Sequence, residues 1–196
     1  MQLLYSNVYR ARVGERAPDA ASLVLVEHDS AAFGDGSHPT TRLCARAVDL
    51  LCRSHPGCAV LDVGTGTGIL ARVARARGAT RIVATDIDAA ARAAAMRNIA
   101  LDHGARVPIA VTDAAPDAGG APFHVVVANI LEGVLAALAP ALVAALVPGG
   151  VLVLSGFTAP QTPFVRARFT ALGVTLVQQA EHDGWHLVVV QAPRQS

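Results

Sequence analysis

Residues 59–70 read AVLDVGTGTGIL, and this stretch decides the fold. An apolar run ends in three alternating glycines, Gly64, Gly66 and Gly68, and apolar residues then resume with helical spacing. The pattern predicts a buried strand that enters a tight turn and continues as a helix. Glycines in such a turn can adopt positive φ and let a ligand lie against the backbone, where the first amides of the helix point at it. The turn therefore predicts a site for a nucleotide-type cofactor.

The spacing of the glycines narrows the class of cofactor. A dinucleotide fingerprint needs a third glycine where this chain has Ile69, so G-x-G-x-G stands in place of G-x-G-x-x-G. A P-loop needs a lysine, and all 16 residues of the Lys+Arg total are arginines. With Asp62, the motif D-x-G-x-G-x-G resembles the first motif of class I methyltransferases that use S-adenosylmethionine. An ordinary strand-to-helix turn is the alternative.

A second element supports the cofactor interpretation. Residues 79–87, ATRIVATDI, predict a short buried strand with an acid at its C-terminal end. Two ribose hydroxyls donate well to one carboxylate, and Asp86 lies at about the offset from the glycine turn where nucleoside sites place such an acid. We assign Asp86 and the adjoining Ile87 to the cofactor. The alternative for Asp86 is a helix N-cap, although Asp88 directly precedes the alanine-rich run and is the better cap.

Composition indicates one globular enzyme domain. At 196 residues, 53% hydrophobic and net charge +1, the chain can bury a substantial core and lacks the basic excess that favours nucleic-acid binding. Neither a signal pattern nor an uninterrupted apolar run of about 18 residues occurs, so we expect a cytoplasmic protein without a membrane segment. Cys44, Cys52 and Cys58 form no C-x-x-C pair and are expected to be free, packed thiols.

Apolar and turn patterns predict strands that alternate with helices. The predicted strands are 59–63, 81–86, 106–111, 123–128, 150–155, 174–180 and 185–191, and the predicted helices are 39–53, 69–77, 89–102, 131–146 and 161–171. Asp183-Gly184 between the last two apolar runs predicts a tight hairpin with an antiparallel final strand. We predict an α/β, Rossmann-like fold: a seven-stranded, mostly parallel sheet ending in an antiparallel hairpin, with helices on both faces.

The opening of the chain is less regular. Residues 1–30 are predicted to be an N-terminal extension, and residues 31–196 the cofactor-binding domain. Within the extension, residues 20–27 fit one strand and residues 14–18 a turn.

Further motifs carry a family resemblance. AFGDGSHPTT at residues 32–41, Asn-Ile-Leu at residues 129–131 and Ser-Gly-Phe at residues 155–157 resemble the PrmA-type methyltransferase family, which modifies ribosomal protein L11. Asp183-Gly184-Trp185 in the hairpin agrees with that family, and the resemblance spans residues 27–190. A glycine-rich loop that caps a helix through Thr40 or Thr41 would explain the threonines of the first motif but not Phe33 and His38.

The resemblance implies roles for individual residues. Asn129 belongs to the family's substrate-side motif, where its amide oxygen would accept a hydrogen bond from an amine; a helix N-cap is the alternative. His38 is a second catalytic candidate as a proton shuttle, although a histidine in such a loop more often bonds its own backbone. The residues expected to bind the cofactor are Phe33, Gly34, Thr40, Thr41, Asp62, Gly64, Gly66, Gly68, Asp86, Ile87, Asp113 and Asn129.

The roles expected of the two threonines and of Asp113 follow from their hydrogen-bonding groups. Thr40 and Thr41, at a helix start, suit the methionine carboxylate through hydroxyls and backbone amides. Asp113 follows a strand where adenine lies in related folds, so it either accepts from the exocyclic amine or is a solvated loop acid. His182 and His186 flank a hairpin turn, so no metal site is expected there.

Two features depart from the family. Asp35 stands where the family usually has threonine, and its charge could favour a cationic sulfonium or substrate. The family also carries an N-terminal domain that captures the ribosomal protein, whereas only about thirty residues precede the Phe33 loop here.

The expected function is an S-adenosylmethionine-dependent N-methyltransferase that acts on a protein amine (lysine or N-terminal) or on a small-molecule amine. A small-molecule O- or N-methyltransferase of a biosynthetic pathway is the alternative, and a nicotinamide-dependent oxidoreductase or a non-catalytic cofactor-binding module are more distant ones. The oligomeric state is left open.

Overall fold

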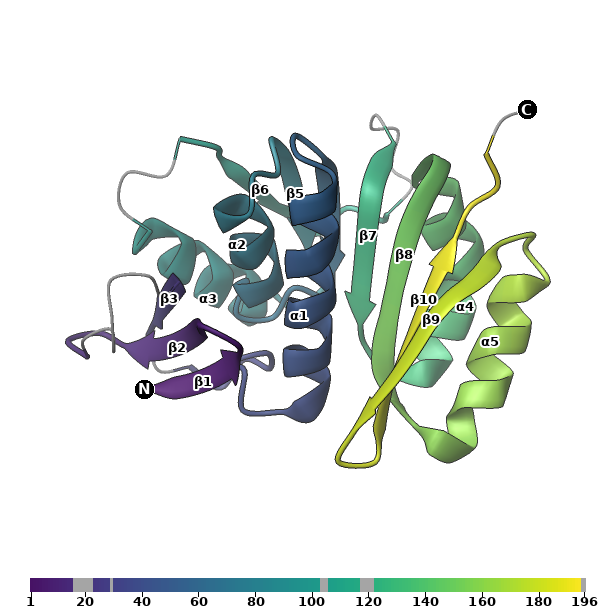
Figure 1. Cartoon of the computed structure of the whole chain (residues 1–196). Helices are drawn as coiled ribbons and strands as arrows, with labels where there is room; N and C mark the ends of the chain where they lie inside the picture. Colours follow the sequence, from purple (N-terminus) through teal and green to yellow (C-terminus); the bar gives the residue numbers. More distant parts are fainter. Residues whose placement is uncertain (16–22, 29, 103–105, 117–121, 195–196) are drawn as a thin grey trace.

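The computed structural model describes residues 1–15, 23–28, 30–102, 106–116 and 122–194 (Figure 1). A seven-stranded sheet in the order β6-β5-β4-β7-β8-β10-β9 forms its centre. Its strands are β4 (Ala59–Val63), β5 (Arg81–Thr85), β6 (Ile109–Thr112), β7 (Phe123–Asn129), β8 (Leu146–Thr158), β9 (Thr175–His182) and β10 (Trp185–Gln191). The helices are α1 (Pro39–Ser54), α2 (Ile69–Ala76), α3 (Ala89–Ala100), α4 (Glu132–Ala144), the 3₁₀ helix η1 (Ala159–Gln161) and α5 (Thr162–Thr170).

The direction of the strands confirms the predicted fold class. Strands β4 to β8 pair in parallel, while β10 is antiparallel to both β8 and β9. In the hairpin between β9 and β10, Asp183 has φ 51° and Gly184 has φ 79°. Both values suit a two-residue turn whose twist matches the flanking strands. The fold is therefore Rossmann-like, with a C-terminal antiparallel hairpin.

The core lies on both faces of the sheet because its central strands alternate between two apolar clusters. In β4, Val60 packs with α1 and α2, whereas Leu61 and Val63 pack with α4 and α5. Every residue of β4 is buried, as expected for a parallel strand covered by helices on both sides. Asp62 shares the face of Val60, so its carboxylate lies in the interior beneath α2.

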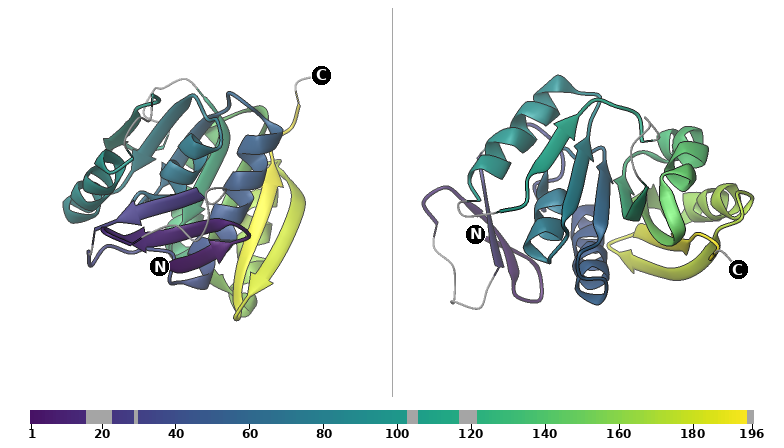
Figure 2. Two further views of the ribbon diagram at one scale, coloured as in Figure 1. Left: turned by 60° about the vertical axis from the view of Figure 1, so that its left-hand side comes forward. Right: turned by 90° about the horizontal axis from the view of Figure 1, so that it is seen from above.

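A second, three-stranded sheet precedes the main one. It consists of β1 (Gln2–Tyr5), β2 (Val8–Arg12) and β3 (Leu23–Glu27), where β1 and β2 are antiparallel and β2 and β3 are parallel. Leu4, Val8 and Leu25 enter the same apolar cluster as α1 and α2. The views of Figure 2 show these strands lying against that side of the molecule. The N-terminal residues thus contribute to the core, and a domain boundary at residue 30 stays a prediction.

Some predicted elements need correction. Strands β1 and β2 were not expected, and the described part of the predicted strand 20–27 is β3. Strand β8 begins four residues before residue 150 and includes Pro148, Gly149 and Gly150, next to a register shift in its pairing with β7. The helix expected over 161–171 is α5 over residues 162–170, and Gln161 is the last residue of the preceding 3₁₀ helix η1. Gly14 has φ 93° at the start of the predicted turn 14–18, of which residues 16–18 lie outside the described residues.

The three cysteines are free and buried, as expected, and Cys52 and Cys58 lie with their sulfurs 3.6 Å apart. Within the described ranges, no helix combines the length and the apolar character needed to cross a bilayer.

Candidate cofactor and substrate site

The glycine turn joins β4 to α2 at the C-terminal edge of the sheet. Gly64, Gly66 and Gly68 all have positive φ, at 71°, 55° and 84°. The amides of Gly64 and Thr65 donate to the carbonyl of Thr85 at 2.8 and 2.9 Å, which fixes the turn to the end of β5. A Cβ built on Gly66 would lie 2.0 Å from the carbonyl oxygen of Phe33. Only glycine fits at this position, because the backbone of the Phe33 loop occupies the space of a side chain.

Asp62 supports this turn from the interior. Its Oδ2 accepts from the hydroxyl of Thr65 at 2.6 Å and from the amide of Ala71 at 3.2 Å. Its Oδ1 is buried and has no hydrogen-bond partner among the described residues. Burial raises the pKa of Asp62 to about 6, against the opposing effect of the two hydrogen bonds. The side chain is therefore an acceptor that stabilises the turn and keeps one oxygen free.

Asp86 lies directly beside the turn. Its Oδ2 accepts from the amide of Gly66 and its Oδ1 from the amide of Asp88, both at 3.0 Å. Asp88 caps α3 by accepting from the amide of Ala90 at 2.8 Å, which confirms its expected role as the cap, while ribose binding by Asp86 stays a prediction. Ile87 follows with 95% of its surface exposed. The Asp86 carboxylate, which keeps lone pairs free, and the exposed apolar side chain of Ile87 thus lie next to each other at the C-terminal edge of the sheet.

Asp113 reaches the same edge from β6. Thr85 and Thr112 are partners in the register of β5 and β6, so Asp86 and Asp113 are adjacent at the strand ends. The Asp113 side chain is 71% exposed and lies 3.7 Å from a guanidinium nitrogen of Arg92. Arg92 in turn donates to the carbonyls of Asp86 and Ile87. The ends of β4, β5 and β6 therefore bring together the residues assigned to the nucleoside.

Asn129 ends β7 on the other side of the turn. Its side chain is 8% exposed, and its Oδ1 has no hydrogen-bond partner within the described part of the chain. The N-cap of α4 is Leu131, which makes no side-chain cap, so the alternative role of Asn129 as a helix cap is wrong. The neighbouring Ile130 contacts the turn, since a Cβ on Gly64 would lie 2.3 Å from Ile130 Cγ2. Asn129 thus offers a buried acceptor next to the cofactor turn.

His38 has the local role that competes with catalysis. Its Nδ1 accepts from the amide of Thr40 at 3.3 Å and lies 2.8 Å from the Thr40 hydroxyl, so His38 is the N-cap of α1. Partial burial and the charge of Arg42 lower the pKa of His38, which favours its neutral form near pH 7. A catalytic role for His38 stays a prediction.

Thr41, in the first turn of α1, is fully buried, and its hydroxyl has no partner among the described residues.

Three aromatic rings meet in front of this helix start. The Phe33 ring, 55% exposed as a residue, lies 5.2 Å from the His38 ring, and the His38 ring lies 4.5 Å edge-on from Trp185. Trp185 begins β10, and the family resemblance gives it no role beyond that of a hairpin residue. The single tryptophan next to Asp-Gly was the available signal, but its proximity to His38 depends on the pairing of β8 with β10.

Asp35 requires a correction. Its carboxylate lies 3.2 Å from a guanidinium nitrogen of Arg10 in β2 and accepts from the amide and hydroxyl of Ser37. Burial opposes ionisation, but the hydrogen bonds from Ser37 and the charge of Arg10 outweigh it and lower the pKa of Asp35. Its charge is thus engaged with the N-terminal sheet, and the expected attraction of a cationic sulfonium loses its basis.

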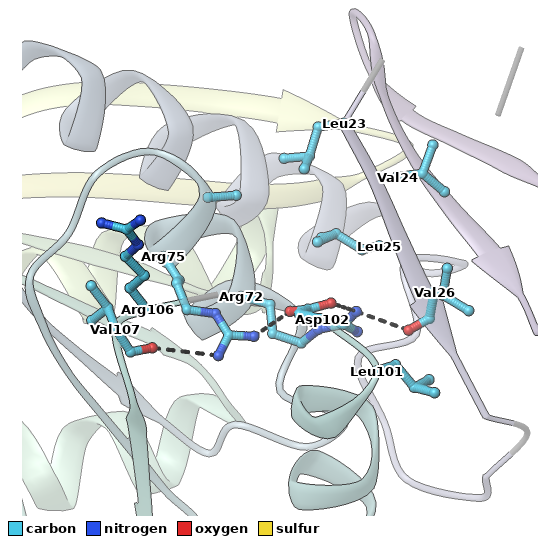
Figure 3. A pocket seen from close by; sticks show the side chains of 11 residues that line it. Leu23, Val24, Leu25, Val26, Arg72, Arg75, Leu101, Asp102, Arg106 and Val107 are labelled. Atoms are coloured by element: carbon cyan, nitrogen blue, oxygen red, sulfur yellow. Dashed lines mark hydrogen bonds and ion pairs between the residues drawn. The ribbon is translucent and has the colours of Figure 1, made fainter. Parts of the chain in front are cut away.

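A cavity of about 530 Å³ lies away from the glycine turn, between β3 and α2 (Figure 3). Leu23, Leu25 and Val26 line one side. Arg72 and Arg75 line the other, and both pair with Asp102, with Arg72 at 2.5 Å. Arg72 also donates to the carbonyl of Val26 at 2.8 Å. These charges bind one another and join the N-terminal sheet to α2, so the cavity has the character of a structural junction. In the described part of the chain, no three His, Cys, Asp or Glu side chains gather as metal ligands.

We predict that Gly66→Ala weakens binding of S-adenosylhomocysteine, the demethylated form of the expected cofactor, by at least about tenfold in calorimetry, because the new Cβ displaces the Phe33 backbone. Gly78→Ala is the matched control: Gly78 has φ 92° but nothing within 4 Å of a Cβ. It should lose about 1 kcal/mol of stability from backbone strain and retain affinity within about threefold. Equal affinities in both variants would contradict the steric account.

Asp62 predicts a pH dependence of stability. With a pKa of about 6 in the folded state and about 3.9 in the unfolded chain, the folded state binds the proton more tightly. The stability due to protonation is present below about pH 4 and is lost as the pH rises through about 6. Between about pH 3 and about pH 7, the free energy of unfolding of the wild type should fall by about 3 kcal/mol more than that of Asp62→Asn, as measured by urea unfolding. If the free energies of unfolding of the two proteins changed in parallel with pH, burial would not raise the pKa of Asp62.

Comparison with known proteins identifies relatives along nearly the whole chain. Residues 12–193 match the family model of ribosomal protein L11 methyltransferase (PrmA). The ribosomal protein L11 methyltransferase of Janthinobacterium sp. (strain Marseille) is 42% identical over 190 residues, covering 95% of this chain and 59% of that protein. The one of Syntrophotalea carbinolica is 44% identical over 170 residues, covering 86% and 55%. The chain thus spans little more than half the length of these relatives.

Solved structures agree with the sequence comparison. The crystal structure of ribosomal protein L11 methylase from Lactobacillus delbrueckii subsp. bulgaricus has a TM-score of 0.87 at 26% identity and covers 98% of both chains. N-methyltransferase NodS from Bradyrhizobium japonicum, in complex with S-adenosylhomocysteine, shares the fold, with a TM-score of 0.60 at 17% identity, covering 81% of this chain and 90% of that one. The match of residues 12–193, which include the glycine turn, the Phe33 loop and Asn129, shows that this chain belongs to the ribosomal protein L11 methyltransferase (PrmA) family.

Proposed function

We propose that this chain is an S-adenosylmethionine-dependent N-methyltransferase whose acceptor is an amine of ribosomal protein L11. The observation that carries the proposal is the buried, unpartnered Oδ1 of Asn129 next to the glycine turn. A buried acceptor without a donor is unfavourable unless a ligand or water supplies one. An amine placed there would satisfy it, and would lie close to a cofactor held by the turn.

The residues at the turn fit the proposed cofactor. Asp86 can accept from two ribose hydroxyls, because its present bonds to Gly66 and Asp88 leave lone pairs free. Ile87 offers an exposed apolar surface for a base, with Asp113 beside it. At the other end, Asp62 Oδ1 and the hydroxyl of Thr41 are buried and unpartnered within the described residues, as expected of groups that meet a polar amino-acid end. When bound, the cofactor supplies an electrophilic methyl group on a positively charged sulfur.

The protein's task is then to present a neutral amine. An alkylammonium of pKa about 10.4 needs roughly 4.6 kcal/mol to lose its proton at pH 7. Burial beside a positive charge lowers that pKa, so no strong base is required. Asn129 Oδ1 accepts one N–H and aims the lone pair, while the rings of Phe33, His38 and Trp185 exclude water from one side. The ammonium proton leaves to solvent, because His38 Nδ1 accepts from the amide of Thr40 and Nε2 of the neutral ring therefore already carries its hydrogen.

The proposed substrate follows from the relatives that this chain matches. The relatives named ribosomal protein L11 methyltransferase are longer than this chain, so the additional part of those proteins is one way in which L11 could be held. A protein of the ribosome agrees with the cytoplasmic location expected from the sequence. No observation specifically favours a small-molecule acceptor or nicotinamide chemistry.

The direct test combines binding and transfer. Calorimetry should detect S-adenosylhomocysteine and neither NAD nor NADP, and labelled S-adenosylmethionine should transfer its label to purified L11 and not to a small-molecule extract. Binding of NAD without S-adenosylhomocysteine would reject methyl transfer altogether. Label found only in small molecules would reject the protein acceptor and leave the methyltransferase.

Asn129→Ala separates catalysis from cofactor binding. Because the variant removes an acceptor for the amine and leaves the turn intact, we expect methyl transfer to fall by about 100-fold and the affinity for S-adenosylhomocysteine to change by less than about threefold. Gln178→Ala, on the exposed strand β9, removes an amide side chain elsewhere and should leave both unchanged. Full transfer by Asn129→Ala would mean that Asn129 does not orient the acceptor.

A further inference from the structure

Thr67 connects the glycine turn to the loop of residues 33–38, whose aromatic rings the proposed function places beside the acceptor amine. It lies in the glycine turn and is 1% exposed. Its amide donates to the carbonyl of Phe33, and its hydroxyl donates to the carbonyl of Gly34, both at 3.0 Å. Both bonds leave the turn and reach the loop that carries the aromatic residues. A single side chain and its own amide thus attach the cofactor turn to the Phe33–His38 loop.

The two loops also touch through bare backbone. A Cβ on Gly66 would lie 2.0 Å from Phe33 O, and one on Gly34 would lie 3.7 Å from the Thr67 amide nitrogen. Gly34 has φ 99°, a conformation that glycine adopts without strain. With no side chain between them, the turn cannot shift toward or away from the loop without breaking contacts or compressing them.

The carbonyl of Thr67 is bonded to α3. It accepts from Asn98 Nδ2 at 3.0 Å, and Asn98 Oδ1 accepts from the amide of His28 at 2.9 Å. Asn98 belongs to α3 and is 1% exposed, so this bond is shielded from water. Since the amide, hydroxyl and carbonyl of Thr67 all bond outside the glycine turn, Thr67 is fixed to α3 on one side and to the Phe33 loop on the other.

The Phe33 loop links Thr67 to the aromatic rings that the proposed function places beside the acceptor amine. It ends at His38, whose ring contacts both Phe33 and Trp185. We propose that Thr67 is a positioning residue that couples occupation of the cofactor turn to the arrangement of Phe33, His38 and Trp185. The inference rests on the proposed function, because it assumes that the turn binds the nucleoside cofactor. It adds that the rings of Phe33, His38 and Trp185 take up their arrangement in response to the cofactor and not independently of it.

Trp185 provides a direct readout, because it is the only tryptophan of the chain. Titration of the wild-type protein with S-adenosylhomocysteine should change the fluorescence of Trp185. In Thr67→Val the hydroxyl donor is lost while shape and amide remain. We expect calorimetric affinity to stay within about threefold of wild type, while the fluorescence change falls to less than about half. Thr67→Ser restores the donor and should restore the response.

Thr80→Val is the matched control. The hydroxyl of Thr80 donates to the carbonyl of Gly57 at 2.7 Å, so this variant also removes a threonine-to-glycine hydrogen bond, at the opposite edge of the sheet. It should leave both affinity and fluorescence response unchanged. If Thr67→Val does not fold, Thr67→Cys, with a weaker donor and less apolar bulk, should show the same reduced response.

The outcomes are distinguishable. Wild-type protein that fails to bind S-adenosylhomocysteine overturns the proposed function. Binding with no change in Trp185 fluorescence, or a full change in both Thr67→Val and Thr67→Cys, overturns the coupling and leaves the proposed function intact. A reduced response at preserved affinity that Thr67→Ser rescues supports it, since a merely structural defect would lower affinity as well.

Discussion

The site depends on the absence of a side chain at three positions of the turn between β4 and α2. Each of its three glycines makes room for a different part of the molecule. Gly64 lies against Ile130 after β7, Gly66 against the carbonyl of Phe33, and Gly68 against Ala95 of α3. Because these approaches are too close for most side chains, the turn is the point at which the end of β7, the Phe33 loop and α3 converge. The buried Asp62 holds it in this conformation.

The core of the fold could be predicted because it follows from local patterns. The apolar run of β4 predicts a strand buried on both faces, and Asp183-Gly184 predicts the hairpin that reverses the last strand. Strands β1 and β2 could not be predicted in this way. They are only four and five residues long, QLLY and VYRAR, without a clear apolar alternation, and become strands through pairing with each other and with β3. Non-local pairing of this kind leaves little signal in a short segment.

The same distinction between local and non-local signals applies to the candidate site. Acids and glycines at strand ends could be placed from the sequence, since parallel strands bring their C-terminal ends to one edge. Side-chain pairs between distant segments could not. Asp35 gives no sign in the sequence that Arg10 of β2 neutralises it, and nothing near His38 indicates contact with Trp185. The role of Asn98 behind Thr67 likewise depends on the packing of α3 against the turn.

The central claim is that the glycine turn and Asp86 hold a sulfonium nucleoside whose reactive end faces Asn129. A crystal structure of this chain with S-adenosylhomocysteine tests it most directly. The account predicts ribose hydroxyls on the Asp86 carboxylate, the amino-acid end along Gly64 to Gly66, and the sulfur toward Asn129 Oδ1. A ligand bound instead in the cavity between β3 and α2, or one whose ribose does not touch Asp86, would contradict it.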